Sequence, residues 1–251
     1  MSGHSHWSTI RRKKGAADAK RGQLFTKLAK DITIAARDGG GDPTMNLRLQ
    51  YAIDRARAQN MPKDGIERAI KRGTGELKEG GQIEEITYEG YGPHGIALMM
   101  ECVTDNRNRA VADIRHTLNR FGGNFAEAGA VGWQFTRISY FAFPLNEKNP
   151  DEIFELAVEA GADDVTFVDN LVEIIAAVES FKEISDRLEE AGIEVQDAEL
   201  RMIPNNETEL GVEETMQVLK VIEALEDLED VQRVYSNMLL TDQIMAEMEA
   251  A

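Results

Sequence analysis

Apolar residues recur at the spacing of an α-helix in the first third of the chain. In residues 16–37 they fall on one face of a helix, and three glycines at 39–41 end the pattern. Two further stretches with the same period follow, at about 43–59 and 62–72. The spacing therefore predicts three short helices that pack together as a small domain.

Asp42 and Pro43 indicate where the second of these helices begins. Asp is a favoured N-cap residue because its carboxylate accepts a hydrogen bond from an unpaired backbone N–H, and Pro is favoured at the first helical position. We therefore expect Asp42 to cap a helix that starts at Pro43.

The period changes to that of β-strands after a polar, glycine-rich segment at 77–82. Alternating or continuous apolar runs predict strands at 83–89, 96–103 and 131–135. A helix is predicted at 108–121, between the second and third of these strands. One helix is too few to cover a sheet, so this part of the chain needs elements from elsewhere.

Residues 138–204 contain a complete β-α-β-α-β order of predicted elements. A helix at 212–228 and a strand at 231–239 follow it, and a lone helix and strand cannot bury their own apolar faces. We therefore predict that these last two elements return to the second domain, which makes the third domain an insertion.

The predicted fold class is α+β, with helices on one face of each sheet. The predicted domains are a helical domain at 1–76, a discontinuous α/β domain at 77–136 plus 206–251, and an inserted α/β domain at 137–205.

Charge changes sign along the chain. Residues 1–72, called here the basic head, hold 16 Lys and Arg against 7 Asp and Glu, a net charge of +9. The remaining residues carry a net charge of −26, which brings the whole chain to −17. A basic module on an acidic body is typical of a protein that binds a polyanion through that module, because the acidic part repels the ligand.

The candidate nucleic-acid-binding residues are ten cations that lie in the first two predicted helices and in the segment before them. Phosphate is their natural partner, because each neutralised phosphate releases counterions. The predicted set is Arg11, Arg12, Lys13, Lys14, Lys20, Arg21, Lys27, Lys30, Arg48 and Arg55. The cations of the third helix, Arg68, Lys71 and Arg72, extend the charge.

A second, weaker signal lies at the junction between the strand at 96–103 and the helix after it. Arg107 and Arg109 stand at the start of that helix, where a positive charge opposes the helix dipole. We interpret them as a candidate interaction surface. Asp105 or Asn106 is expected to cap the helix.

No motif in the sequence argues for an enzyme. Gly90, Gly92 and Gly95 match G-x-G-x-x-G, but Pro93 interrupts the motif and a strand follows it, so we interpret it as a hairpin connection. Cys102, the single cysteine, lies in an apolar strand and is expected to be buried. We predict no catalytic residue, no metal, no cofactor and no small-molecule substrate.

The sequence also predicts a cytoplasmic protein without a membrane contact. No apolar stretch approaches the ~20 residues of a membrane span, and the first seven residues lack the apolar core of a signal peptide. A single cysteine cannot form an intrachain disulfide, which fits a reducing compartment.

Several stretches spread over nearly the whole chain resemble the YebC/PmpR family of bacterial proteins, whose eukaryotic relative is a mitochondrial translational activator. The matching stretches are Gly3-His4-Ser5-His6-Trp7, Asp18-Ala19-Lys20-Arg21-Gly22, Gly39-Gly40-Gly41-Asp42-Pro43, Asn60-Met61-Pro62, Tyr88-Glu89-Gly90-Tyr91-Gly92-Pro93, Thr104-Asp105-Asn106-Arg107-Asn108-Arg109, Gly122-Gly123-Asn124 and Asp230-Val231-Gln232. The resemblance implies an N-terminal helical bundle and two ferredoxin-like α/β domains, without a cofactor or catalytic residues.

The resemblance also implies a function. Members of the family are described as DNA-binding transcriptional regulators, and others act on the ribosome and ease translation through proline runs. The first hypothesis is therefore a DNA-binding transcriptional regulator that uses its basic head. The alternatives are a ribosome-associated translation factor that binds ribosomal RNA and relieves stalling, and an acidic scaffold that binds a protein partner.

Overall fold

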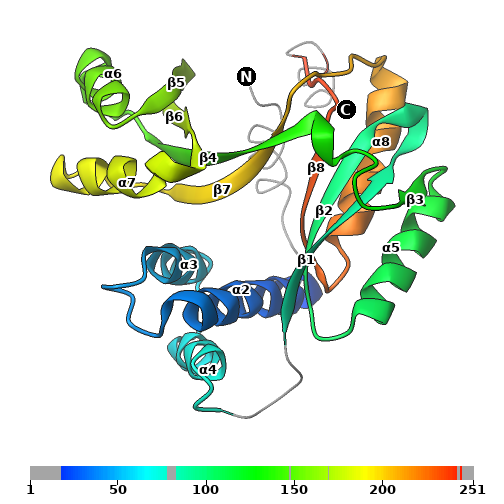
Figure 1. Cartoon of the computed structure of the whole chain (residues 1–251), viewed down its shortest axis with the longest axis horizontal. Coiled ribbons are helices and arrows are strands. Elements are labelled where there is room, and N and C mark those ends of the chain that lie inside the picture. Colours follow the sequence, from blue (N-terminus) through cyan, green and yellow to red (C-terminus); the bar gives the residue numbers. More distant parts are fainter. Residues whose placement is uncertain (1–17, 78–82, 147, 169, 242–243, 245–251) are drawn as a thin grey trace.

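The computed structural model describes residues 18–77, 83–146, 148–168, 170–241 and 244. Helices at the N-terminal end lie beside two four-stranded antiparallel sheets (Figure 1). The second sheet is formed entirely by residues that lie between the third and fourth strands of the first sheet in the chain. The predicted α+β class with one inserted unit is confirmed, while the predicted domain limits stay predictions.

The helical unit consists of α2 (Asp18–Gly39), α3 (Leu47–Ala58) and α4 (Lys63–Gly73). Apolar residues at helical spacing on all three helices form one buried cluster, which includes Ile32, Leu49 and Ile66. Gly73 lets α4 approach α2 closely, because a Cβ atom at that position would lie 2.4 Å from the carbonyl oxygen of Thr33.

The predicted start of the second helix is wrong. Asn46, not Asp42, is the N-cap of α3, and its side-chain oxygen accepts a hydrogen bond from the Leu49 N–H at 3.1 Å. The Asn46 amide also donates to the carbonyl oxygen of Ala35 at 2.7 Å, which ties the cap to α2. Asp42 instead closes a local turn by accepting from the Thr44 N–H at 3.0 Å, an alternative that short polar side chains offer to the backbone.

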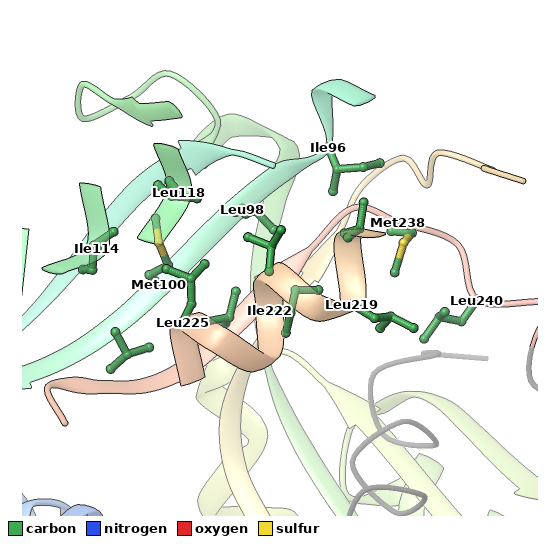
Figure 2. Packing of buried hydrophobic residues seen from close by; sticks show 14 of the residues in the cluster. Ile96, Leu98, Met100, Ile114, Leu118, Leu219, Ile222, Leu225, Met238 and Leu240 are labelled. Atoms are coloured by element: carbon green, nitrogen blue, oxygen red, sulfur yellow. The ribbon is translucent and has the colours of Figure 1, made fainter. Parts of the chain in front are cut away.

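The first sheet contains β1 (Glu84–Tyr91), β2 (Ala97–Thr104), β3 (Asn124–Ala126) and β8 (Val231–Ser236), in the order β3-β1-β2-β8. Helices α5 (Arg107–Arg120) and α8 (Val212–Glu226) pack on one face of it. Figure 2 shows the core between them, where Leu98 and Met100 of β2 face Ile222 and Leu225 of α8. The C-terminal helix and strand thus complete this sheet, as predicted.

The connection between β1 and β2 is a hairpin turn. Residues Pro93–Gly95 form one turn of 3-10 helix, in which His94 has φ 61° and Gly95 has φ 75°. The backbone N–H of Gly92 donates to the Ile96 carbonyl at 2.8 Å and closes the turn. This connection lies between two antiparallel strands, so the G-x-G-x-x-G match is not a dinucleotide-binding loop.

The strand predicted at 131–135 is also wrong. The third strand along the chain is the edge strand β3, and residues Gly132–Gln134 form a 3-10 turn. The Glu89 carboxylate causes this folding, because it accepts hydrogen bonds from the N–H groups of Gly129, Val131 and Gly132 at 2.6–2.9 Å. Val131 is fully buried, which explains its strand-like apolar pattern.

The second sheet contains β4 (Phe135–Pro144), β5 (Ala162–Val168), β6 (Leu171–Ala176) and β7 (Asp197–Pro204), in the order β5-β6-β4-β7. Helices α6 (Pro150–Glu159) and α7 (Phe181–Glu190) connect its strands. The chain order β-α-β-β-α-β with this strand order is the ferredoxin-like arrangement. The first sheet has the same number of strands and helices in a different chain order.

Candidate nucleic-acid interface

The predicted phosphate-binding residues fall into three groups in the structure. Arg11, Arg12, Lys13, Lys14 and the side chain of Lys20 lie outside the described residues. Arg21 is exposed near the start of α2. The other four, Lys27, Lys30, Arg48 and Arg55, contact acidic or carbonyl groups, and each has at least one such contact in the sheet-containing part of the chain.

Two lysines of α2 contact the last residue of α8 and the turn that follows it. The Lys27 ammonium donates to the carbonyl oxygen of Glu226, and that of Lys30 donates to the carbonyl oxygen of Glu229 at 3.0 Å. A helix C-terminus presents unpaired carbonyls and the negative end of the dipole, so it binds cations well. Lys30 is only 11% exposed, and we infer that its main role is to hold the helical unit against the first sheet.

Asp230 connects Lys30 to α5. Its carboxylate pairs with the Lys30 ammonium at 2.9 Å and with both Nε and Nη2 of Arg109, at 2.9 and 2.8 Å. Burial alone would raise the pKa of Asp230, but the hydrogen bonds from Arg109 and Lys30 outweigh burial and hold the pKa below its ordinary value. A two-point contact with a guanidinium is among the stronger ionic interactions in proteins.

Glu199 on β7 joins all three parts of the molecule. Its buried carboxylate, 8% exposed, pairs with Arg55 of α3 at 2.7 Å, with Arg201 of the same strand and with Arg233 of β8. Burial alone would raise the pKa of Glu199, but the guanidiniums of Arg233, Arg201 and Arg55 outweigh it and hold the pKa well below its ordinary value. We call these four residues the Glu199 cluster.

Arg48 is held more loosely than Arg55. It is 51% exposed and lies 3.3 Å from Asp38 of α2 and 3.1 Å from Glu85 of β1. Exposed pairs of this kind contribute about 0–1 kcal/mol, so Arg48 remains available to a phosphate.

The carboxylates that hold these cations were missed by sequence reasoning. Asp230 and Glu199 follow Lys30 and Arg55 by 200 and 144 residues. The sequence around each carboxylate does not indicate with which cation it pairs. The structure therefore separates the cations of the basic head into those that hold the fold and those that face solvent.

Three cations of α4 form an outward-facing group. Arg68, Lys71 and Arg72 stand at positions i, i+3 and i+4, which share one side of a helix. Arg68 and Lys71 are exposed, and Arg72 is half-buried. In the part of the chain that the structure describes, no carboxylate lies within salt-bridge distance of these three side chains.

Arg107 and Arg109, the second predicted surface, both make ion pairs within the molecule. Arg107 pairs with Glu84 of β1, and Arg109 pairs with Asp105 at 2.9 Å as well as with Asp230. Asn106 is the cap of α5, since its side-chain oxygen accepts from the Arg109 N–H at 3.1 Å.

The cysteine, possible metal ligands and possible membrane-spanning helices were considered as other candidate sites. Burial raises the pKa of the Cys102 thiol to about 12, so the reactive thiolate is scarce at neutral pH. Among the described residues, no group of three or more His, Cys, Asp or Glu side chains is arranged to hold a metal ion. None of the helices described is long and apolar enough to cross a membrane.

Comparison with known proteins gives the family. The family model described as the TACO1/YebC protein N-terminal domain matches residues 5–76, and the model of the TACO1/YebC second and third domain matches residues 83–238. A probable transcriptional regulatory protein of Chlorobaculum tepidum is 53% identical over 250 residues, with 99% of each chain covered. One of Geobacter sulfurreducens is 49% identical over 248 residues, which cover 99% of this chain and all of that protein.

A solved structure agrees with this assignment. The crystal structure of a conserved hypothetical protein of Aquifex aeolicus is similar with a TM-score of 0.80 and 41% sequence identity, over 90% of this chain and 93% of that one. The resemblance seen in the sequence is confirmed, and the chain belongs to the TACO1/YebC family.

Proposed function

We propose that this protein regulates transcription by binding duplex DNA through the exposed cations of its basic head. Relatives about half identical over their full length are named probable transcriptional regulatory proteins, which supports this role. The observation that carries the proposal is the outward-facing group of Arg68, Lys71 and Arg72, in a head of net charge +9 on an otherwise acidic chain.

The cations of the head divide into two roles in this proposal. The phosphate-binding residues are the outward-facing group on α4, Arg48, and the cations Arg11, Arg12, Lys13, Lys14, Lys20 and Arg21. Lys27, Lys30 and Arg55 orient the head through their contacts with α8, Asp230 and Glu199. The proposal includes no catalytic residue, metal or cofactor.

Backbone contacts dominate this mode of binding. The exposed side chains of α4 are charged, and no Asn or Gln lies within Lys63–Gly73 to read a base edge. With about five phosphates engaged, log K should fall against log salt with a slope of roughly −4 to −5. The contribution of α4 should therefore depend strongly on salt and only weakly on sequence, and a preference for particular promoters has to come from residues outside α4.

The test compares two double variants of the full chain on a 30-base-pair duplex over a salt series. Arg68→Gln with Lys71→Gln removes two cations of α4, and Lys182→Gln with Arg187→Gln removes two exposed cations from α7. We expect the first variant to bind more weakly, with a slope smaller by about 2. Equal binding by the first variant and the unmodified protein would remove α4 from the phosphate-binding surface.

The lack of an amide side chain on α4 also favours a second candidate, a translation factor that binds structured RNA through backbone contacts. Crosslinking in cells, with both DNA and RNA sequenced, separates the two candidates. Enrichment of a few promoters supports the regulator. Enrichment of ribosomal or transfer RNA without promoters overturns it in favour of the translation factor.

A further inference from the structure

Helix α5 has a charge opposite to that of the part of the chain around it. Residues 73–251 hold 12 Lys and Arg against 38 Asp and Glu. Four of those 12 cations, all arginines, lie within the 14 residues of α5, which contain one acidic residue, Asp113. Ion pairs within the molecule explain Arg107 and Arg109, so the two arginines that need another explanation are Arg115 and Arg120.

The cations of α5 lie on the side that faces away from the sheet. Ala110, Ile114 and Leu118 are buried against the first sheet. The exposed residues of the helix include Asn108, Arg115, His116, Asn119 and Arg120. Figure 1 shows α5 at the outside of the molecule, beyond the strands of the first sheet.

Arg115 and Arg120 are held in place without neutralisation. The Arg115 guanidinium lies 5.4 Å from the ring centre of Phe125, and that of Arg120 lies 5.5 Å from that of Phe121. In the described part of the chain, neither guanidinium has a carboxylate within salt-bridge distance, whereas Arg107 and Arg109 both do. A ring contact restricts the rotamers of an arginine and leaves its N–H groups free to donate.

We propose that the outer face of α5, with Arg115 and Arg120 as its main donors, is a second surface that binds the phosphate backbone of duplex DNA. Planar guanidiniums match phosphate oxygens in pairs, and Asn108, Asn119 and His116 add hydrogen-bonding groups typical of backbone contacts. The face from Asn108 to Arg120 is ~18 Å long, about half of one turn of B-DNA. The inference rests on the proposed function, because it assigns the same ligand to a second site.

The two sites are linked in the structure. Arg109 of α5 and Lys30 of α2 bind the same Asp230 carboxylate, which fixes the start of α5 relative to the basic head. The shared carboxylate therefore connects the start of α5 to the basic head, and the net charge of −26 on residues 73–251 disfavours DNA binding to the rest of the protein.

The test uses the full chain on a random-sequence 30-base-pair duplex, with binding measured at several salt concentrations. Arg115→Gln with Arg120→Gln should lower the affinity about 10- to 60-fold at 0.1 M salt and make the slope shallower by about 2, equally for different sequences. Arg115→Lys with Arg120→Lys keeps both charges and should restore most of the slope. Both arginines are exposed, so neither variant leaves a cavity, and circular dichroism checks that each is folded.

The matched control removes the same charge from another helix. Lys182→Gln with Arg187→Gln on α7 should leave the slope unchanged. If the unmodified protein binds DNA and the α5 variant has the same slope, α5 is not a phosphate-binding surface, while the proposed function stands. If the α7 control loses as much as the α5 variant, the effect comes from net charge and the inference fails. If the unmodified protein does not bind DNA, both proposals fail together.

Discussion

Glu199 is a single residue that contacts all three parts of the molecule. Replacement by Gln keeps its shape and takes the shared carboxylate from the half-buried guanidiniums of Arg55, Arg201 and Arg233. Each arginine keeps a longer pair, with Asp31, Asp197 and Glu101 respectively, so the cost falls below the about 3–5 kcal/mol of a fully uncompensated buried charge. We therefore expect Glu199→Gln to lower the free energy of unfolding by about 2–3 kcal/mol, measured by urea denaturation at pH 7.

Arg48→Gln is the comparison for this prediction. It removes an arginine with exposed ion pairs from α3, the helix that carries Arg55, so it should cost no more than about 1 kcal/mol. Similar losses in the two variants would show that the burial of the Glu199 cluster has no energetic consequence.

Asp230 makes the stability depend on pH in a predictable direction. Its pKa is lowered in the folded protein, so its charged form favours folding above the ordinary Asp pKa of about 3.9. That contribution is lost as pH falls from this value through the lowered pKa. The difference in unfolding free energy between the unmodified protein and Asp230→Asn should therefore be constant from pH 8 to 5 and shrink below pH 4. A difference that grows on acidification would contradict the assignment.

At the scale of the helix or strand, the spacing of apolar residues predicted most elements correctly, whereas the predicted cap of the second helix was wrong. The helical and β periods identified most elements, because burial of an apolar face depends on local spacing alone. The prediction of Asp42 as the cap was wrong because Asn46 caps the helix instead. The Asn46 side chain also makes a tertiary hydrogen bond, to the Ala35 carbonyl of α2, which cannot be predicted from local sequence. Residues 131–135 failed as a strand because the Glu89 carboxylate, on another strand, folds that backbone into a turn.

The Asn46 cap gives a direct prediction. Asn46→Ala removes the bond to the Leu49 N–H and leaves the carbonyls of Ala35 and Gly40 without their amide donor. A lost cap costs about 1 kcal/mol and an unsatisfied buried acceptor about 1–3 kcal/mol, so we expect a loss of about 2–3 kcal/mol. Asp42→Ala, which affects only an exposed turn, is the control and should cost less than about 1 kcal/mol. An Asp42 variant as unstable as the Asn46 variant would restore the predicted cap.

At the scale of the whole molecule, charge asymmetry predicted which end of the chain should bind a polyanion but not which cations are available. Net charge can be counted from the sequence, whereas the pairing of Lys30 with Asp230 and of Arg55 with Glu199 depends on how the sheets return to the helices. The reversed charge of α5 could have been found from the sequence. The predicted surface instead centred on Arg107 and Arg109, which the fold neutralises.

We expect the same ion pairs to hold the basic head against the two sheets. Lys30→Gln with Arg55→Gln leaves Asp230 paired with Arg109, and Glu199 paired with Arg201 and Arg233, so no buried carboxylate loses all its partners. What remains at the interface includes a hydrogen bond from Arg37 to the Ile83 carbonyl at 2.6 Å, and the edge-on contact between Tyr51 and Phe181. We expect faster amide hydrogen exchange in α2 and α3 of this variant, with little change in the two sheets, because the head opens locally before the sheets unfold.

Arg57→Gln with Lys63→Gln is the matched control for the attachment of the head. It removes two cations of the same helical unit, and among the described residues these pair with their own neighbours, Asp54 and Glu67, so it should leave exchange unchanged. Protection of α2 and α3 that survives the loss of Lys30 and Arg55 would mean that the apolar contacts hold the head by themselves. In that case Lys30 and Arg55 would not be needed to orient the head. The proposed division of the head into orienting residues and phosphate-binding residues would then be wrong.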